Sequence, residues 1–431
     1  MIYVLFITVL VLAILNFITQ RRDILSPSFW ACVMFEISIL VNILNVDRWG
    51  TSYSWKALIM IILGLSMLMM GEVCSKQFRI KEKPREIQNR TDKIDNPIFI
   101  NSATMFVLIC ISLACLLIDI RIMTRITGSR NVFSALFSAR NVLTTGEIKR
   151  GFWGRFALSV NKGIAFVLIY IVLYNGVLCQ TKIKKSCLIP IALFCIEAIL
   201  STGRTLFIRI IAYSFIIFVL FYISKNGTKI QQLNRIVLIG IGALGVFIVI
   251  FTLLGKLIGK GQYDAALDVL YYYSGSSINL FNKYIIQVGR PDSAYFGEHT
   301  LYGIYNILHY IIPGIEHNSN PALETMYLPH WYSNIYTAFR RYYQDFGMLG
   351  MIIIPFCLGV FYGRLEMNAK THLSNKWSAI IYAYAIYPII EIAIEERFLV
   401  NFLSFSTVFE LVVLYIMFKI VTRIRFTIRV H

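Results

Sequence analysis

The chain has 431 residues, of which 57% are hydrophobic and only 15% are charged, whereas a soluble globular domain has about 25% charged residues. Its apolar residues form runs of about 17 to 23, the length of helix that crosses a hydrocarbon core of ~30 Å. This composition excludes a soluble protein and predicts an all-α, polytopic integral membrane protein. The net charge of +18 therefore indicates membrane topology and an anionic substrate, with no nucleic acid as a partner.

About eleven transmembrane helices are predicted. The first run is followed, not preceded, by basic residues, Arg21 and Arg22. A cleavable signal peptide has the opposite order, so we expect a retained helix with its N-terminus outside. In chain order, the apolar runs lie near 2–19, 26–45, 54–75, 98–120, 156–178, 187–203, 205–224, 236–258, 348–365, 377–395 and 403–421.

The basic residues between the runs predict which side of the membrane each segment faces. With the N-terminus outside, the six cytoplasmic segments contain 22 of the 41 Lys and Arg residues, and 76–97 alone contains seven. The C-terminus is then cytoplasmic. This topology divides the chain into an eight-helix region (1–258), one long outer loop (259–347) and a three-helix region (348–431).

One outer segment breaks the charge rule. Residues 121–155 contain seven basic residues and one acid, Glu147, and such a surplus attracts an anionic substrate. Arg140 and Arg150 of this segment are candidate substrate-binding residues. The alternative interpretation is a solvated loop whose charges meet only lipid phosphates.

Ionisable residues inside the apolar runs cluster near the predicted outer ends of the helices. Glu197 precedes a tight turn at 201–204 that contains Arg204, and a second group follows at 391–397. Such residues are costly within a membrane and indicate function, although snorkelling or ion pairing accounts for part of them. At the mouth of a helix pair, the guanidinium of Arg204 is suited to bind a diphosphate through two parallel hydrogen bonds, which Lys cannot do.

The long outer loop contains 14 of the 25 tyrosines. A tyrosine ring suits the headgroup level of a membrane and equally the apolar face of a sugar. We expect the stretch 300–313 to form helices that lie on the membrane. Four of the six histidines also occur in the loop, but without the spacing of a zinc helix, and the eight cysteines form no CxxC pair. We therefore expect no metal site and no disulfide framework.

The loop ends in a motif, NIYTAFRRYYQDFGMLG, at 334–350. Together with the aromatic loop and the STGRT turn at 201–205, it resembles the oligosaccharide repeat-unit polymerases of bacteria, the Wzy or O-antigen polymerase family. The family pattern reads roughly Asn-x-Tyr-Thr-x-x-x-x-Tyr-Tyr-x-Asp-Phe-Gly-x-x-Gly. The residues that fall on this pattern in register are Asn334, Tyr336, Thr337, Tyr342, Tyr343, Asp345, Phe346, Gly347 and Gly350.

The resemblance implies a GT-C-like membrane glycosyltransferase at the outer face of the bacterial plasma (inner) membrane. Such enzymes polymerise undecaprenyl-diphosphate-linked oligosaccharide repeat units into O-antigen or capsular polysaccharide, and they need no nucleotide sugar or other cofactor. Their implied partners are membrane lipids and a chain-length regulator protein. The family's arginine at the turn between two mid-chain helices corresponds to Arg204, and its basic residue in the motif corresponds to Arg340 or Arg341.

The leaving group of that reaction is a diphosphate, so preorganised arginines are expected to supply most of the catalysis. The acceptor hydroxyl needs a general base, for which Glu197, His330 and Asp345 are candidates. Asp345 equally suits the N-cap of a helix that starts near Phe346. The candidate substrate-binding residues within the motif are Asn334, Tyr336, Tyr342 and Tyr343.

Two other functions remain open at this point. An O-antigen ligase, which transfers polymer to the lipid A core, shares the helices, the long outer loop and the arginines. A lipid-linked oligosaccharide flippase or other transporter would instead place its charges in a central cavity and would lack a loop of 89 residues.

Overall fold

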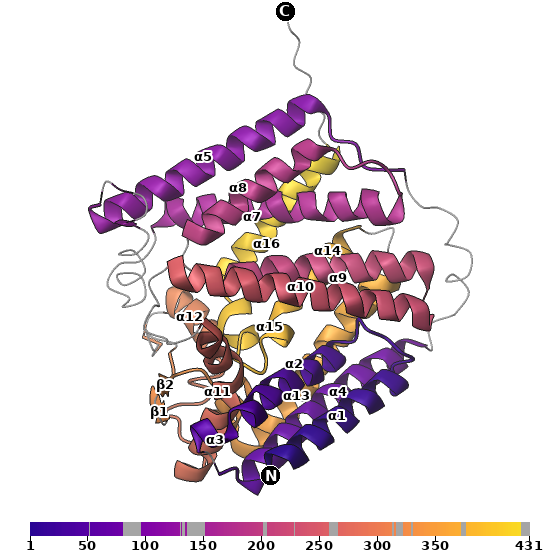
Figure 1. Cartoon of the computed structure of the whole chain (residues 1–431). Coiled ribbons are helices and arrows are strands. Elements are labelled where there is room, and N and C mark those ends of the chain that lie inside the picture. Colours follow the sequence, from indigo (N-terminus) through magenta and orange to yellow (C-terminus); the bar gives the residue numbers. More distant parts are fainter. Residues whose placement is uncertain are drawn as a thin grey trace, which may run out of the picture. The chain divides into compact units, whose positions relative to one another are not determined.

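The computed structural model is helical through most of the chain (Figure 1). It describes residues 1–50, 52–80, 96–129, 131, 134–135, 151–200, 205–227, 229–257, 266–312, 314–315, 322–328, 331–371 and 376–423. These residues form two compact units, and each is described by itself. The first unit comprises the described parts of Met1–Arg90 and Leu267–Thr407, and the second those of Thr91–Ala266 and Val408–His431.

The first unit contains the whole motif at 334–350. Its helix α13 packs along α4, and α1 and α2 lie beside α4 (Figure 1). The only strands within the described residues form one antiparallel pair in which Tyr327 is opposite Tyr332. Its elements are α1 (Ile2–Thr19), α2 (Pro27–Leu44), α3 (Val46–Trp49), α4 (Trp55–Ile80), α11 (Ala266–Gln287), α12 (Tyr302–Ile311), β1 (Met326–Leu328), β2 (Trp331–Ser333), α13 (Phe339–Thr371), α14 (Lys376–Ala385), α15 (Tyr387–Ile390) and η4 (Phe398–Phe402).

The second unit is built from long helices around α7. Aromatic rings fill its interior, and Phe166 stacks on Tyr213 with ring centroids 4.5 Å apart. The elements are α5 (Ser102–Thr127), α7 (Phe152–Leu173), η2 (Tyr174–Leu178), η3 (Lys185–Cys187), α8 (Leu188–Leu200), α9 (Thr205–Asn226), α10 (Ile230–Leu257) and α16 (Phe405–Arg423), of which α16 falls mostly in this unit.

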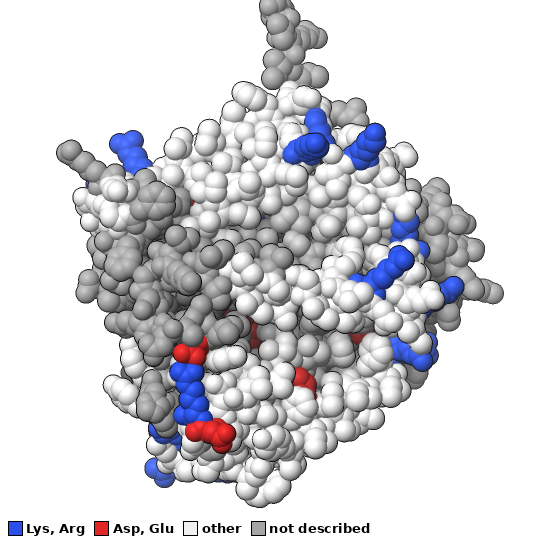
Figure 2. All heavy atoms as spheres, in the orientation of Figure 1, with Lys and Arg blue, Asp and Glu red and all other residues white. Residues whose placement is uncertain are grey.

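Eight helices of the described residues are long and apolar enough to cross a membrane. Large apolar side chains such as Ile7, Ile14 and Ile18 of α1 are exposed on them, and charged side chains are sparse over the described part of the face in Figure 2. The prediction of an all-α, polytopic membrane protein is therefore confirmed. The eight spans are Ile2–Thr19, Pro27–Leu44, Trp55–Gln77, Ser102–Thr127, Phe152–Leu178, Thr205–Asn226, Phe339–Thr371 and Phe405–Thr422.

Glycines bring α4 and α13 into close contact. A Cβ atom added at Gly71 would lie within 3.0 Å of the Phe356 carbonyl group, and one added at Gly359 would meet the Leu68 carbonyl group equally closely. Small residues let membrane helices approach until their backbones touch. This contact holds the middle of α13 against α4, and the motif lies at the N-terminal end of α13.

A buried ionic cluster joins the turn between α1 and α2 to the cytoplasmic ends predicted for α4 and α13. Lys76 Nζ lies 2.6 Å from both Glu72 Oε1 and Glu366 Oε2, and Lys370 pairs with Glu366 and Asp23. Three carboxylates thus share two ammonium groups. Burial and the neighbouring Glu366 carboxylate raise the pKa of Asp23 to about 6.

The prediction of one membrane helix over 377–395 is wrong. Helix α14 ends at Ala385, the four-residue α15 follows, and turns occupy 391–394. Pro388 lies in the first turn of α15, and because a proline has no backbone N–H, it cannot donate the i→i−4 hydrogen bond that would continue α14. The chain is thereby directed toward the charged segment 391–397 instead of continuing across.

The predicted long outer loop contains a buried helix, α11, that the sequence analysis did not anticipate. Its polar side chains are satisfied by neighbouring elements: Asn282 Oδ1 accepts a 2.8 Å bond from the Ser54 N–H, and Ser277 Oγ donates to the Ala393 carbonyl oxygen at 2.5 Å. These residues lower the hydropathy of the segment although they are buried. Helix α12 lies within the stretch 300–313, for which helices were predicted.

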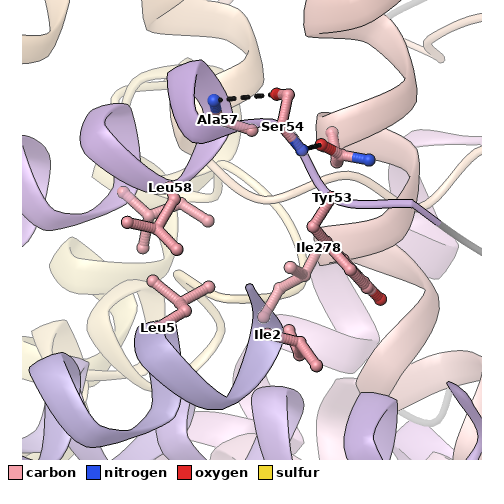
Figure 3. Close-up of a pocket in the computed structure, with 9 residues that line it drawn as sticks. Ile2, Leu5, Tyr53, Ser54, Ala57, Leu58 and Ile278 are labelled. Carbon is pink, nitrogen blue, oxygen red and sulfur yellow. Dashed lines mark hydrogen bonds between the residues drawn. The ribbon is translucent and has the colours of Figure 1, made fainter.

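A small cavity lies where α1, α4 and α11 meet (Figure 3). Its volume of ≈ 10 Å³ is about that of one water molecule, so it cannot hold a sugar. The residues that line it are Ile2, Leu5, Tyr53, Ser54, Ala57, Leu58, Ile61, Ile278 and Asn282.

Candidate active site around Arg340 and Arg341

The two adjacent arginines of the motif begin helix α13, and both are buried. Arg340 is only 1% exposed. Its Nη2 donates a 2.6 Å hydrogen bond to Glu324 Oε1, and its Nη1 donates to Gln344 Oε1, one turn along the helix. The guanidinium carbon lies 3.2 Å from the centroid of the Tyr284 ring. A buried guanidinium is tolerated only with such partners, so the surroundings of Arg340 are built to hold a positive charge.

Arg341 points to a different group of residues. Its Nη1 donates a 3.0 Å bond to the His299 carbonyl oxygen, and the carboxylates of Glu395 and Glu396 act on it electrostatically. Arg340 and Arg341 are consecutive, so their side chains leave the helix about 100° apart. Either arginine fits the family pattern in the sequence, and the structure shows that the two form distinct sites of positive charge.

The tyrosines of the motif are buried, and their hydroxyl groups bond to the protein. Tyr336 donates to the Glu324 carbonyl oxygen at 3.1 Å, Tyr342 to Glu396 Oε1 at 3.1 Å, and Tyr343 to the Gly289 carbonyl oxygen at 2.8 Å. Burial raises the pKa of Tyr336. These contacts hold the segments around the arginines in place. Asn334, by contrast, is exposed.

Asp345 ties the segment before α12 to α13. Its Oδ2 accepts bonds from the backbone N–H groups of His299, at 3.1 Å, and Thr300, at 2.6 Å. The expected helix start near Phe346 is confirmed, because α13 consists of two helices that meet at Gly347, whose φ is 58°. The hydrogen bonds of the Asp345 side chain nevertheless go to His299 and Thr300. Asp345 therefore caps another segment rather than its own helix.

The charged segment 391–397 lies against the motif. Glu396 is buried and accepts bonds from the N–H groups of Phe398, Leu399 and Val400 at 2.8–3.0 Å, so it caps η4. Burial raises the pKa of Glu396, although the N–H groups of Leu399 and Val400 oppose the effect. Arg397 is paired with Glu391 at 2.9 Å and with Glu395 at 2.7 Å.

The other predicted site residues lie elsewhere or outside the described residues. Glu197 belongs to the second unit, where it is fully buried and accepts a hydrogen bond from Asn161 Nδ2. Arg140, Arg150, Arg204 and His330 lie outside the described residues. In the described part of the chain, no group of three or more His, Cys, Asp or Glu side chains is placed to hold a metal ion.

Sequence reasoning missed three partners of Arg340. Gln344 follows it at the i, i+4 spacing that puts two side chains on one helix face, so the sequence contained a signal for this contact. Tyr284 and Glu324 approach from α11 and from the segment before β1. No local spacing relates either residue to the motif.

The comparisons with known proteins add one similarity. No model of a protein family matches the chain, and no solved structure matches it. Over 212 residues, the chain is 24% identical to a Shigella dysenteriae protein named O-antigen polymerase, and the match covers 47% of this chain and 49% of that protein. The chain thus spans about half the length of this curated relative. The present chain is a multi-pass, all-α membrane protein, and its resemblance to O-antigen polymerases is confirmed by this similarity.

Proposed function

We propose that the chain is a membrane glycosyltransferase that polymerises undecaprenyl-diphosphate-linked oligosaccharide repeat units into O-antigen or capsular polysaccharide. The observation that carries the proposal is the pair of buried arginines, Arg340 and Arg341, within a polymerase-like motif. A lipid-linked substrate must be bound at the membrane, and fixed positive charges must stabilise its diphosphate. The similarity to an O-antigen polymerase supports the same reaction.

In the proposed reaction, a hydroxyl oxygen of the acceptor unit attacks the anomeric carbon of the growing chain. A new C–O bond forms, the bond between that carbon and the diphosphate oxygen breaks, and the lipid diphosphate leaves with the bonding electrons. Arg340 or Arg341 stabilises the charge that grows on the leaving oxygen, and Arg204 is proposed for the same role. The exposed Asn334, together with Arg140 and Arg150, is proposed to bind substrate.

The proton of the acceptor hydroxyl must pass to a base, for which Glu197, His330 and Asp345 remain the candidates. Asp345 is the least suited, because its carboxylate already accepts hydrogen bonds from the backbone N–H groups of His299 and Thr300. Tyr336, Tyr342 and Tyr343 are proposed to bind substrate, and the bonds of their hydroxyl groups also hold the segments around the arginines in place.

The proposed location is the outer face of the bacterial plasma membrane, with the N-terminus outside and the C-terminus in the cytoplasm. The distribution of Lys and Arg among the connecting segments supports this orientation. The proposed partners are membrane lipids, the lipid-linked repeat units and a chain-length regulator protein.

Gel analysis of surface polysaccharide from a strain that lacks the gene tests the proposal. Loss of a polymerase leaves lipid core with a single repeat unit attached, and the wild-type gene restores the ladder. Bare core with accumulated lipid-linked polymer would identify a ligase instead. Bare core with single units trapped inside the cell would identify a flippase.

A further inference from the structure

We propose that Glu324 is a displaceable counter-ion, which occupies a phosphate subsite on Arg340 until the substrate diphosphate replaces it. This inference rests on the proposed function, because it names the group of the substrate that Arg340 binds. It also identifies a residue for the reaction, Glu324, that lies outside the polymerase-like motif at 334–350.

One edge of the Arg340 guanidinium is only half occupied. The Nε–H and Nη2 groups of an arginine share one edge, which can donate two parallel hydrogen bonds to two oxygens of a phosphate. In Arg340, Nη2 donates to Glu324 Oε1 at 2.6 Å. The buried Nε has no hydrogen-bond acceptor among the described residues. Glu324 thus satisfies one donor of a two-donor edge.

The plane of this guanidinium is fixed. Its carbon lies 3.2 Å from the Tyr284 ring centroid and 5.2 Å from that of Tyr336, and Gln344 holds the remaining nitrogen, Nη1. Arginine stacks favourably on aromatic faces. The half-occupied edge is therefore preorganised, and an arriving anion finds both donors already in place.

Glu324 is free to leave without moving the backbone. Its side chain is 45% exposed, whereas that of Arg340 is only 1% exposed. The Glu324 carbonyl oxygen is held separately by the Tyr336 hydroxyl at 3.1 Å. Rotation of the side chain alone carries the carboxylate into solvent and opens the edge of Arg340.

The charge balance requires that an anion take its place. A buried guanidinium that loses its counter-charge is strongly destabilised, so water alone does not replace the carboxylate. A diphosphate supplies the lost charge and also an acceptor for the Nε–H. Exchange of a single carboxylate oxygen for two phosphate oxygens therefore favours the bound substrate.

Titration of the purified, detergent-solubilised chain with inorganic pyrophosphate tests this assignment by calorimetry. The variant Glu324→Gln retains an oxygen that can accept from Nη2, so the fold is preserved, but it removes the competing charge. We expect Glu324→Gln to bind pyrophosphate about tenfold more tightly than the wild-type chain. The double variant Glu324→Gln/Arg340→Lys should lose this gain, because the two substitutions act on one site.

The matched control is Asp268→Asn. Asp268 pairs with the guanidinium of Arg48 in the same unit, at 2.5 Å and 3.1 Å, so this variant also releases an arginine from a carboxylate. Its pyrophosphate affinity should equal that of the wild-type chain. A similar gain in Asp268→Asn would show general charge attraction and overturn the subsite.

Unchanged or weaker pyrophosphate binding by Glu324→Gln would also overturn the assignment. So would a gain in affinity that persists in the double variant Glu324→Gln/Arg340→Lys. Glycerol phosphate, the headgroup of an anionic phospholipid, serves as a second probe. A gain confined to glycerol phosphate would mean that the edge holds a membrane lipid rather than a diphosphate.

These titrations do not depend on the polysaccharide ladder. If deletion of the gene leaves the ladder intact while Glu324→Gln still tightens pyrophosphate binding, the proposed function fails and the subsite stands. If deletion leaves single-unit product but the affinity is unchanged, the function stands and the role of Glu324 is refuted.

Discussion

At the scale of single residues, Arg340 combines burial, stacking on Tyr284 and two hydrogen-bonded side chains. The variant Arg340→Lys keeps the charge but loses the planar fork and the stacking surface. Loss of one preorganised donor to a developing charge costs about 10²–10³ in rate. We therefore expect mostly single-unit product on a gel of surface polysaccharide from cells that express Arg340→Lys.

The control for this variant is Arg48→Lys, which alters an arginine that is also paired with a carboxylate but lies outside the motif. It should leave the ladder intact. Immunoblots of the membrane fraction establish that both variants accumulate. A normal ladder from Arg340→Lys would remove this residue from the catalytic machinery and leave Arg341 and Arg204.

We expect His299 to make the stability of the first unit depend on pH. Burial lowers its pKa, with a contribution from Arg341 and Arg340, although Asp345 and Glu298 oppose the shift. The folded chain thus disfavours the proton that the unfolded chain binds below about pH 6.5. Stability from this residue is present above that pH and is lost as the pH falls through the lowered, folded-state pKa.

We expect the thermal midpoint of the detergent-solubilised chain to drop between pH 7.5 and pH 5.5, and His299→Gln to reduce that drop. His309→Gln, which changes an exposed histidine bound to the Ile315 carbonyl oxygen, is the control. An identical pH slope in wild-type chain and His299→Gln would contradict the assignment.

The motif tyrosines show what the spacing of residues in a sequence cannot predict. The family pattern selected Tyr336, Tyr342 and Tyr343, but it could not distinguish a ring that contacts sugar from one whose hydroxyl bonds to the protein. The distinction depends on partners such as Glu324, Glu396 and Gly289, which come from other segments. Such long-range partners leave no periodic signal in the sequence.

At the scale of elements, the contact between α4 and α13 depends on glycine. In Gly359→Ala, the new Cβ would lie within 3.0 Å of the Leu68 carbonyl oxygen and of the Glu72 nitrogen. Backbone atoms cannot rotate away, so the two helices must separate. We expect Gly359→Ala to lower the thermal midpoint and to reduce the folded yield in detergent, measured by size-exclusion chromatography.

The matched control is Gly242→Ala in α10, where a Cβ atom would meet no atom within 4 Å. Alanine is the better helix former by about 1 kcal/mol in an exposed position, so this variant should be neutral or stabilised. Equal midpoints for the two variants would mean that the close approach of α4 and α13 is not required for folding.

Apolar runs predicted the simple helices well and the irregular ones poorly. The runs 2–19 and 26–45 correspond to α1 and α2 almost residue for residue, because such segments bury or expose apolar side chains along their whole length. Helix α11 was missed because its buried serines and asparagines, satisfied by other elements, resemble a polar loop. The run 377–395 is apolar enough for a span, yet local geometry at Pro388 interrupts it.

At the scale of the whole molecule, sidedness in the membrane decides where the reaction takes place. Reporter fusions within Gly289–Asp292 should give an outside signal, and fusions within 81–93 should give an inside signal. The basic residues of 76–97 are the physical reason, since they resist transfer across the membrane. An inside signal from Gly289–Asp292 would place Arg340 and the reaction on the cytoplasmic side.

Polymerisation by the purified chain is the central claim and can be measured directly. The detergent-solubilised protein is incubated with undecaprenyl-diphosphate-linked repeat units as sole substrate, and the products are separated by size on a gel. We expect a ladder of lipid-linked oligomers from the wild-type chain, and single units only from Arg340→Lys. If the wild-type chain is folded and binds pyrophosphate but yields only single units, polymerisation by this chain is contradicted.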